Sequence, residues 1–260
     1  MTSAPAIYAH RFGGQFGPES SRAALERSLS GPVDGFEADV VLSADGEVLA
    51  CHDPLLQLST ADLSGWAHQY PAAVLTRAHL LDGQGGPSDQ SPLLLGQVLE
   101  IIPSDLPLQL DIKAYADIEL ARRTAEACCR TSAEVGRASQ IEVISFFTPA
   151  CEAAVAHGAR ARLVLWADYD PQALVKWVLD RGIDGLSLEG FILNQEFREL
   201  VREAGLSISV GAVNTAEQLD RLLPLEPEII VSDTPHMIRA MVDAYHDAGP
   251  DPVAHASAPR

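Results

Sequence analysis

The side chains best suited to chemistry lie close together in the N-terminal part of the chain, each at the end of a short apolar run. They are His10, Arg11, Glu37, Asp39 and His52. Glu37 and Asp39 are two residues apart, so a strand presents both carboxylates on one face. Two histidines, an arginine and a carboxylate pair gathered in this way indicate a catalytic or binding site.

The elements that must position these residues follow a regular βα alternation. We expect eight strands near Ile7–His10, Gly35–Val41, Leu108–Ile112, Ile141–Ser145, Arg162–Leu165, Asp184–Leu188, Ser207–Val210 and Ile229–Asp233. Helical patterns lie near Ser21–Leu29, Leu94–Ile102, Ile118–Thr131, Pro149–His157, Pro171–Arg181, Gln195–Ala204, Ala216–Leu223 and Pro235–Tyr245. Eight repeats in a chain of this length predict an α/β fold of the TIM (β/α)8 barrel type.

The interval 43–92 breaks this rhythm because it is too long for a simple connection and contains its own β-like run. We interpret it as a small insertion between strands 2 and 3, on the catalytic rim of a single barrel domain spanning residues 1–248. Trp66, Tyr70 and His79 either shape a substrate pocket there or pack the insertion onto the barrel. The Pro- and Ala-rich tail 249–260 is predicted to be disordered.

In a TIM barrel the active site lies at the C-terminal ends of the strands, so polar residues at those ends are the candidates. Asp111 ends the third strand, where its carboxylate is expected to converge with those of Glu37 and Asp39. Three carboxylates held together repel one another unless a cation neutralises them. Oxygen ligands suit Mg²⁺ or Ca²⁺, so these three residues are predicted metal ligands. Further polar residues at strand ends are Ser145, Glu189 and Asp233.

Arg11 and Lys113 are the candidate anion-binding residues, because they are expected beside this metal site. A metal, an arginine and a lysine together suit an anion with several oxygens, of which phosphate is the obvious one. His10 and His52 then supply the acid and the base that phosphoester cleavage requires. The sequence does not assign which histidine takes which role.

Composition limits the binding partners, the location and the state of the cysteines that we expect. The formal net charge of −18 argues against nucleic-acid binding. No apolar window is long enough for a membrane span and no signal peptide is recognisable, which favours a cytoplasmic protein with a small-molecule partner. The spacing of Cys51, Cys128, Cys129 and Cys151 predicts reduced cysteines rather than a zinc site or a disulfide framework. The sequence does not indicate an oligomeric state.

The order of these motifs resembles the glycerophosphodiester phosphodiesterase family. The segments that carry the resemblance are AHRFGGQFGPES, FEADVVLSADGEV, CHDPLL and LQLDIK, with VISFF and IIVSDTP further along the chain. The resemblance implies a TIM barrel that hydrolyses a glycerophosphodiester to glycerol 3-phosphate and an alcohol. It also implies the same metal ligands, catalytic histidines and phosphate-binding residues as above.

Several positions depart from the family pattern and leave the substrate open. Phe12 replaces a glycine and Ser20 an asparagine in the loop beside the phosphate, Asp111 replaces a glutamate, and Ala212 removes an aromatic wall. Sphingomyelinase D enzymes, which form a cyclic phosphate, also have an aspartate at the position of Asp111. The alternatives are therefore another phosphodiester, such as a sugar-phosphate conjugate or a lysophospholipid cleaved directly or through a cyclic phosphate, or a catalytically silent barrel that binds phosphorylated ligands.

Overall fold

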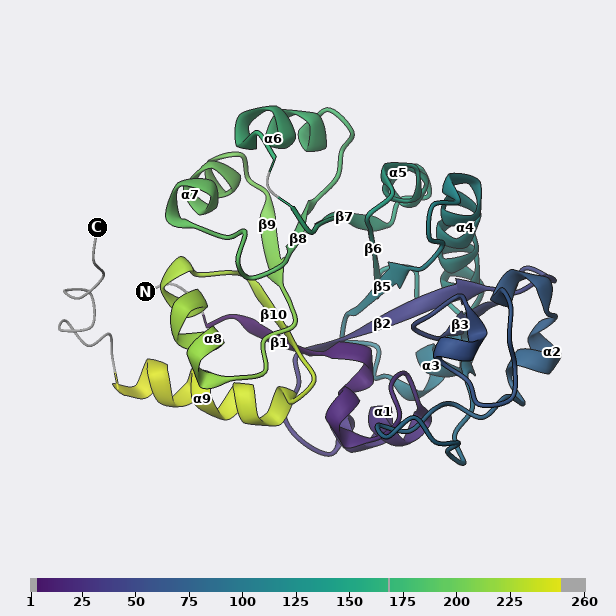
Figure 1. Cartoon of the computed structure of the whole chain (residues 1–260). Coiled ribbons are helices and arrows are strands. Elements are labelled where there is room, and N and C mark those ends of the chain that lie inside the picture. Colours follow the sequence, from purple (N-terminus) through teal and green to yellow (C-terminus); the bar gives the residue numbers. More distant parts are fainter. Residues whose placement is uncertain (1–3, 168, 249–260) are drawn as a thin grey trace.

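Eight of the apolar runs form a closed parallel barrel in the computed structural model, which describes residues 4–167 and 169–248 (Figure 1). The strands are β1 (Ala6–Ala9), β2 (Gly35–Leu42), β5 (Leu108–Ile112), β6 (Ile141–Ser145), β7 (Arg160–Leu165), β8 (Gly185–Leu188), β9 (Ser207–Val210) and β10 (Ile229–Ser232). The barrel is closed because β1 pairs with both β10 and β2. The prediction of a TIM barrel is confirmed.

Helices cover the outside of this barrel (Figure 1). They are α1 (Arg22–Leu29), α3 (Leu95–Ile101), α4 (Ile118–Glu134), α5 (Thr148–Ala156), α6 (Pro171–Leu179), α7 (Gln195–Glu203), α8 (Ala216–Leu222) and α9 (Pro235–Ala248). Local sequence sets where several of them begin, because a polar side chain accepts a hydrogen bond from the first turn. These caps are Ser21, Asp117, Asp170, Asn194 and Thr215. Within the described part of the chain, no helix combines the length and the apolar character needed to cross a bilayer.

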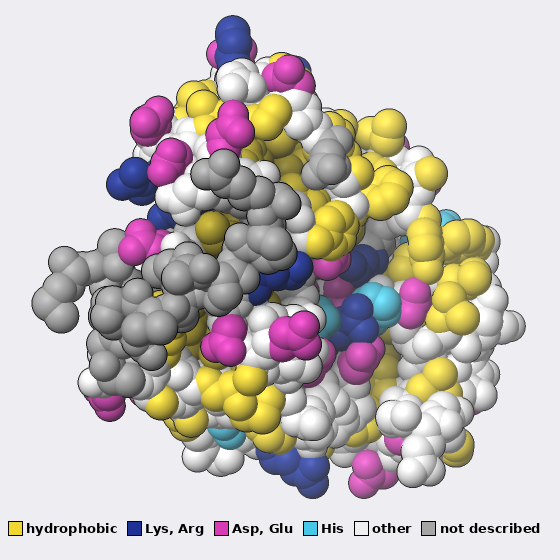
Figure 2. All heavy atoms as spheres, turned by 60° about the vertical axis from the view of Figure 1, so that its left-hand side comes forward, with side chains coloured by type: hydrophobic (Ala, Val, Ile, Leu, Met, Phe, Trp, Pro, Cys, Tyr) yellow, Lys and Arg dark blue, Asp and Glu magenta, His cyan; other side chains and the backbone are white. Residues whose placement is uncertain are grey.

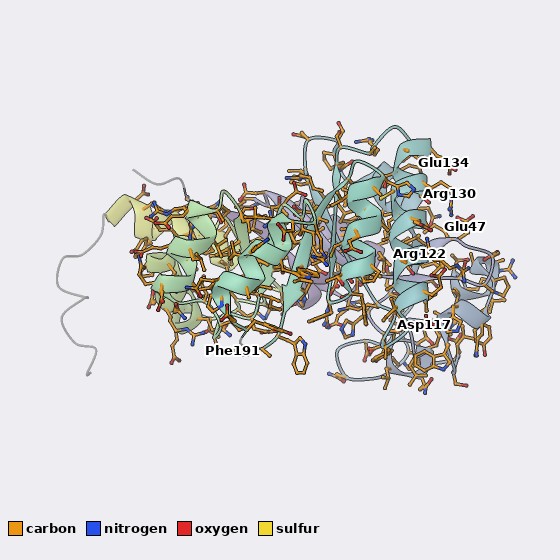
Figure 3. The ribbon with its side chains drawn as sticks, turned by 90° about the horizontal axis from the view of Figure 1, so that it is seen from above. Glu47, Asp117, Arg122, Arg130, Glu134 and Phe191 are labelled. Carbon is orange, nitrogen blue, oxygen red and sulfur yellow. The ribbon has the colours of Figure 1, made fainter. Side chains whose placement is uncertain are left out.

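The segment 43–92 has structure of its own beside β2. Its strand β3 (Val48–Ala50) pairs antiparallel with β2, and β4 (Leu93–Leu94) pairs with β3 just after the segment ends. The short helix α2 (Ala72–Leu75) packs with β3 in a separate hydrophobic cluster. Arg130 of α4 donates a hydrogen bond to the carbonyl of Gly46 at 3.1 Å, which ties the segment to the barrel helices near Glu47 (Figure 3).

Two further predictions concern the cysteines and the tail. All four cysteines are free and buried, in agreement with the prediction of reduced cysteines. The tail 249–260 lies outside the described residues.

A buried polar layer fills the barrel interior beneath the strand ends. Gln109 donates to Glu142 at 2.8 Å, and Glu142 forms an ion pair with Arg162 at 2.8 Å. All three side chains are buried. Each lies two residues before a residue that lines the cavity at the strand ends, so it points into the barrel one layer below.

Arg162→Met is expected to lower the free energy of unfolding by about 3–5 kcal/mol, because it leaves the carboxylate of Glu142 buried without its ionic partner. Urea denaturation of the purified variant measures this change. The double variant Glu142→Gln/Arg162→Met is expected to recover most of the loss, since it removes the orphaned charge as well. A single variant within about 1 kcal/mol of the wild type would contradict a stabilising role for this pair.

Candidate active site

The loop after β1 turns sharply and brings His10 and Arg11 into the centre of the barrel mouth. Arg11, Phe12 and Gly13 all have positive φ values, of 50°, 65° and 86°. Gly13 has no substitute here, because a Cβ atom would lie 2.3 Å from the hydroxyl of Ser28. Consecutive residues in this conformation reverse the chain just after the strand, so the two functional side chains stay at the strand end.

Phe12, which replaces the family's glycine in this loop, points away from the loop surface. Its side chain is fully buried in the core, with its ring centroid 6.3 Å from that of Phe36. Ser20, which stands where the family pattern has an asparagine, also has a structural role, since its N–H donates to the carbonyl of Arg11 at 3.0 Å. Ser21 caps α1. These residues therefore shape the backbone of the loop.

Three carboxylates meet at the ends of β2 and β5. The parallel register places Asp39 beside Asp111, and the alternation of side chains puts Glu37 on the same inner face. One oxygen from each residue lies within 4.8 Å of the others, and all three side chains are buried. The predicted convergence of these residues is therefore present in the structure.

Two cations lie directly on these carboxylates. Lys113 Nζ is 2.9 Å from Asp39 Oδ1 and 2.6 Å from Asp111 Oδ2, and Arg11 Nε is 3.1 Å from Asp39 Oδ2. Burial raises the pKa of Asp39, but Lys113 and Arg11 outweigh it and hold that pKa below its usual value. Burial and the charge of Asp39 raise the pKa of Glu37 to about 7. Glu37 is thus the carboxylate least compensated by the protein's own cations.

His10 is oriented by an acidic residue from the last barrel strand. Its Nδ1 atom is 2.7 Å from Asp233 Oδ1, and its Nε2 atom is 3.8 Å from Glu37 Oε2. Asn214 holds Asp233 in place by donating to Asp233 Oδ2 at 2.5 Å and accepting the backbone N–H of Asp233 at 2.8 Å. Burial lowers the pKa of His10, but the hydrogen bond with Asp233 and the charge of Glu37 raise it to about 9. This arrangement favours the protonated ring.

His52 follows β3 and has a different set of partners. Its Nδ1 atom is 2.8 Å from Asp53 Oδ2, and its Nε2 atom is 2.6 Å from Nη2 of Arg11. Asp53 is itself held by the hydroxyl of Tyr115 at 2.9 Å. Because a guanidinium can only donate, Nε2 of His52 is the acceptor in this contact and carries no proton.

A central cavity with a volume of about 270 Å³ lies at the mouth of the barrel, and His52 adjoins it through its contact with Arg11. It is lined by His10, Arg11, Glu37, Asp39, Asp111 and Lys113 on one side and by residues of β6 to β10, among them Phe146, Glu189 and Ala212, on the other. Figure 2 shows charged and histidine side chains gathered in a hollow on this face of the molecule, with hydrophobic side chains around it. Ala212 lines the wall where the family pattern has an aromatic residue.

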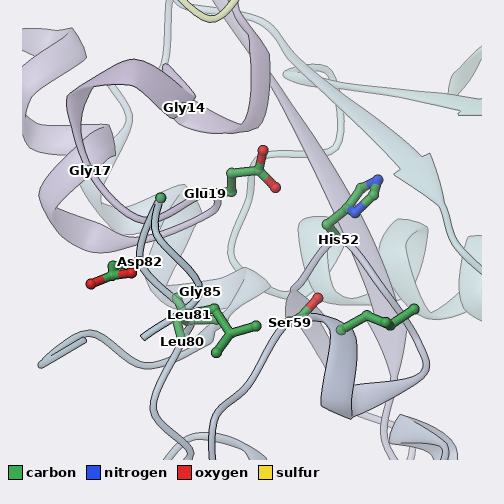
Figure 4. Close-up of a pocket in the computed structure, with 11 residues that line it drawn as sticks. Gly14, Gly17, Glu19, His52, Ser59, Leu80, Leu81, Asp82 and Gly85 are labelled. Carbon is green, nitrogen blue, oxygen red and sulfur yellow. The ribbon is translucent and has the colours of Figure 1, made fainter. Parts of the chain in front are cut away.

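A second hollow lies on the far side of His52, between the glycine-rich loop and the segment 43–92. This side cavity, named the polar side cavity for its two carboxylates, has a volume of about 290 Å³ (Figure 4). It is lined by Glu19, His52, Ser59 and Asp82, by Leu58, Leu80 and Leu81, and by glycines of both loops. Glu19 also accepts a hydrogen bond from Arg11 at 2.8 Å, so the two cavities meet at the Arg11 and His52 side chains.

The residues present fit a divalent cation. Asp111 Oδ1 is buried and has no hydrogen-bond partner among the described residues, and three carboxylates supply only oxygen donors. Such a donor set suits Mg²⁺ or Ca²⁺. The charge balance points the same way, because the ion-pair partner of Glu37 among the described residues is His10, which lies 3.8 Å away and also pairs with Asp233.

Choosing polar residues at the ends of the strands as candidates found some residues that take part in the site and missed others. Asp233 orients His10, whereas Ser145 accepts the N–H of Phe147 at 3.0 Å and does not line the central cavity. Tyr115 and Asn214 carried no local signal, because each acts through a partner distant in sequence. An acidic residue next to a candidate histidine, as in His52-Asp53, was a signal that could have been used.

The aromatic residues expected in the segment 43–92 mainly pack the segment. Trp66 makes edge contact with Tyr115 at 5.6 Å, and the hydroxyl of Tyr70 donates to the carbonyl of Ser64. His79 is exposed and pairs with Asp62 at 3.0 Å. None of the three predicted residues is among those that line the two cavities.

The mouth of this closed (β/α)8 barrel thus carries a carboxylate triad, two cations and two oriented histidines, which is where TIM-barrel enzymes have their active sites. The sequence model of the glycerophosphoryl diester phosphodiesterase family matches residues 10–237, and the chain belongs to this family. The predicted family is therefore confirmed, and with it the prediction of a phosphodiesterase-type enzyme.

Similar proteins extend over nearly the whole chain. A glycerophosphodiester phosphodiesterase from Caldanaerobacter subterraneus subsp. tengcongensis is 22% identical over 240 residues, which cover 91% of this chain and 97% of the relative. A phosphodiesterase from Oleispira antarctica, solved with its product sn-glycerol-3-phosphate, has a TM-score of 0.82 at 21% identity and covers 92% of this chain and 97% of its own. A glycerophosphodiester phosphodiesterase from Thermotoga maritima has a TM-score of 0.75 at 18% identity, with 93% and 100% covered.

Proposed function

We propose that this enzyme hydrolyses a glycerophosphodiester to glycerol 3-phosphate and an alcohol, with Mg²⁺ or Ca²⁺ held by Glu37, Asp39 and Asp111. The single observation that carries the proposal is the convergence of these buried carboxylates with Lys113 and Arg11 at one end of the barrel. The product bound to the Oleispira antarctica relative supports the same substrate class. When bound, the cation supplies charge stabilisation for the phosphoryl oxygens.

Arg11 and Lys113 are proposed to bind the phosphoryl group. Both lie on Asp39 and both line the central cavity, so a small movement takes each cation from the carboxylate to a substrate oxygen. The Arg11 guanidinium offers several donors in one plane, which suits two oxygens of a phosphate. Glu19 keeps the guanidinium oriented through its 2.8 Å contact.

We infer separate roles for the two histidines from their contacts. His52 Nε2 accepts from Arg11 and is free of a proton, which suits a general base for the attacking hydroxyl or water. His10 is held in its protonated form by Asp233 and Glu37, which suits a general acid for the leaving alkoxide. In such a step the bond between phosphorus and the alcohol oxygen breaks, and the proton of His10 passes to that oxygen.

Removal of divalent cations is expected to abolish hydrolysis of glycerophosphocholine, with recovery on addition of Mg²⁺ or Ca²⁺. The reason is that the cation held by the three carboxylates supplies positive charge at the phosphoryl oxygens, and no described group of the protein replaces it there. Release of glycerol 3-phosphate after EDTA treatment and metal titration measures this dependence. Full activity in EDTA would contradict the metal site, and retained binding of glycerol 3-phosphate without turnover at any metal concentration would identify a silent binding protein instead.

A further inference from the structure

An apolar groove adjoins the central cavity on the side of the barrel opposite the segment 43–92. It has a volume of about 450 Å³ and is lined chiefly by Phe146, Leu163, Leu165, Trp166, Tyr169 and Trp177. Its floor is β7, and its walls come from the residues after β6 and from α6 with the loop before it. The volume lies within the roughly 300–1,000 Å³ typical of small-molecule sites.

Large hydrophobic side chains are left exposed along this groove. Trp166 is 65% exposed, Tyr169 is 50% exposed and Phe146 is 41% exposed. Several such residues gathered around one groove indicate a binding surface, whereas single exposed apolar residues are common. Figure 2 shows hydrophobic side chains beside the hollow that holds the charged and histidine residues.

The groove is continuous with the central cavity. Phe146, Val164 and Leu165 line both, and the Lys113 ammonium lies 5.9 Å from the centre of the Phe146 ring. A chain attached to a phosphoryl group beside Lys113 therefore reaches the groove by passing over Phe146. The residues that line both cavities are all apolar.

The two sides of the central cavity differ in chemistry. The polar side cavity offers Glu19, Ser59 and Asp82 beside three leucines, so it has acceptors for the hydroxyl groups of glycerol as well as an apolar wall for its carbons. The apolar groove offers aromatic and aliphatic walls, and the carboxylate among its described lining residues, that of Asp170, is engaged in capping α6. A phosphodiester with one polyol arm and one apolar arm matches this asymmetry.

We propose that the apolar groove binds an alkyl or aryl substituent on the alcohol side of the phosphodiester, so that the preferred substrate is a glycerophosphodiester of an apolar alcohol. This inference rests on the proposed hydrolysis. In the step itself, water adds its oxygen to phosphorus, the bond from phosphorus to the alcohol oxygen breaks, and the apolar alcohol leaves with the proton from His10. The products are glycerol 3-phosphate and the free alcohol.

The test uses the metal-loaded enzyme with glycerophospho-n-alkanols from ethanol to octanol. kcat/KM is expected to rise about threefold to fourfold for each added methylene until the groove is filled. Ala173→Glu places a charge on the groove wall and is expected to flatten this dependence, with the largest loss of kcat/KM on the octyl ester. Gln172→Glu is the matched control, since it puts the same charge in the same turn of α6 outside the lining and should keep the dependence.

Binding provides a second readout that does not depend on turnover. Octyl phosphate is expected to bind more tightly than ethyl phosphate to the wild type and to Gln172→Glu, but not to Ala173→Glu, in titration calorimetry. Equal kcat/KM along the ester series together with equal binding of the two phosphates would overturn the inference. A preference for lysophosphatidylcholine with no dependence on alkanol length would also overturn it, because the apolar arm would then be on the glycerol side. Absence of hydrolysis for every ester refutes the proposed function, and the phosphate titration still decides the groove.

Discussion

His10→Ala is expected to lower kcat on glycerophosphocholine by about 10²–10⁴-fold, yet to lose far less on a glycerophosphodiester of p-nitrophenol. The reason is that p-nitrophenolate leaves without protonation, whereas the choline alkoxide needs the proton of the general acid. His52→Ala is expected to lose a similar factor on both esters, since both require activation of the nucleophile. Stopped assays of glycerol 3-phosphate with the two esters give the comparison.

His79→Ala is the matched control for this pair of variants, because it removes an exposed histidine that lies outside the cavities. It should leave both rates unchanged. Near-wild-type turnover of glycerophosphocholine by either His10→Ala or His52→Ala would sink the paired-histidine mechanism. A rescue of His52→Ala rather than His10→Ala by the p-nitrophenyl ester would reverse the roles of acid and base.

The barrel could be predicted because its strands are marked in the local sequence. The eight apolar runs fall within one or two residues of the strands observed, and prolines at 149, 171 and 235 mark the first turns of helices. The convergence of Glu37, Asp39 and Asp111 followed from the same pattern, since parallel strands bring their ends to one edge. Residue type and strand position together were sufficient for this part of the site.

The remaining contacts depend on side-chain geometry that has no local signature. Asn214 reaches Asp233, which follows the neighbouring strand, and Tyr115 reaches Asp53 from the loop after β5, and neither pair has a characteristic spacing. The inward turn of Phe12 depends on left-handed backbone angles in three successive residues, which a phenylalanine rarely adopts. The apolar groove was also not predicted, because it forms only when α6 and the end of β6 come together over β7.

Glu37→Gln is expected to have opposite effects on the stability of the metal-free protein and on its activity. The pKa of Glu37 is raised by burial and by Asp39 to about 7, above the value of 4.5 for a free glutamate. A raised carboxyl pKa means that the fold disfavours the ionised form, so the stability contributed by the neutral form is lost as pH rises from about 4.5 through 7. The glutamine cannot ionise, and the metal-free variant should therefore melt above the wild type at pH 8.

The same substitution removes one of the three carboxylate ligands, so it should weaken Mg²⁺ or Ca²⁺ binding by at least the roughly 10–100-fold that outer-shell changes cost. The wild type should gain thermal stability when the cation is added, and Glu37→Gln should gain little, with turnover lowered by about 10³-fold. Glu189→Gln, which lines the same cavity outside the triad, should keep the cation-induced rise in Tm. Melting curves at pH 5 and pH 8, with and without cation, separate these outcomes. If the metal-free melting temperatures of Glu37→Gln and the wild type coincide at pH 8 while both respond equally to the cation, Glu37 is neither repelled by its neighbours nor a ligand.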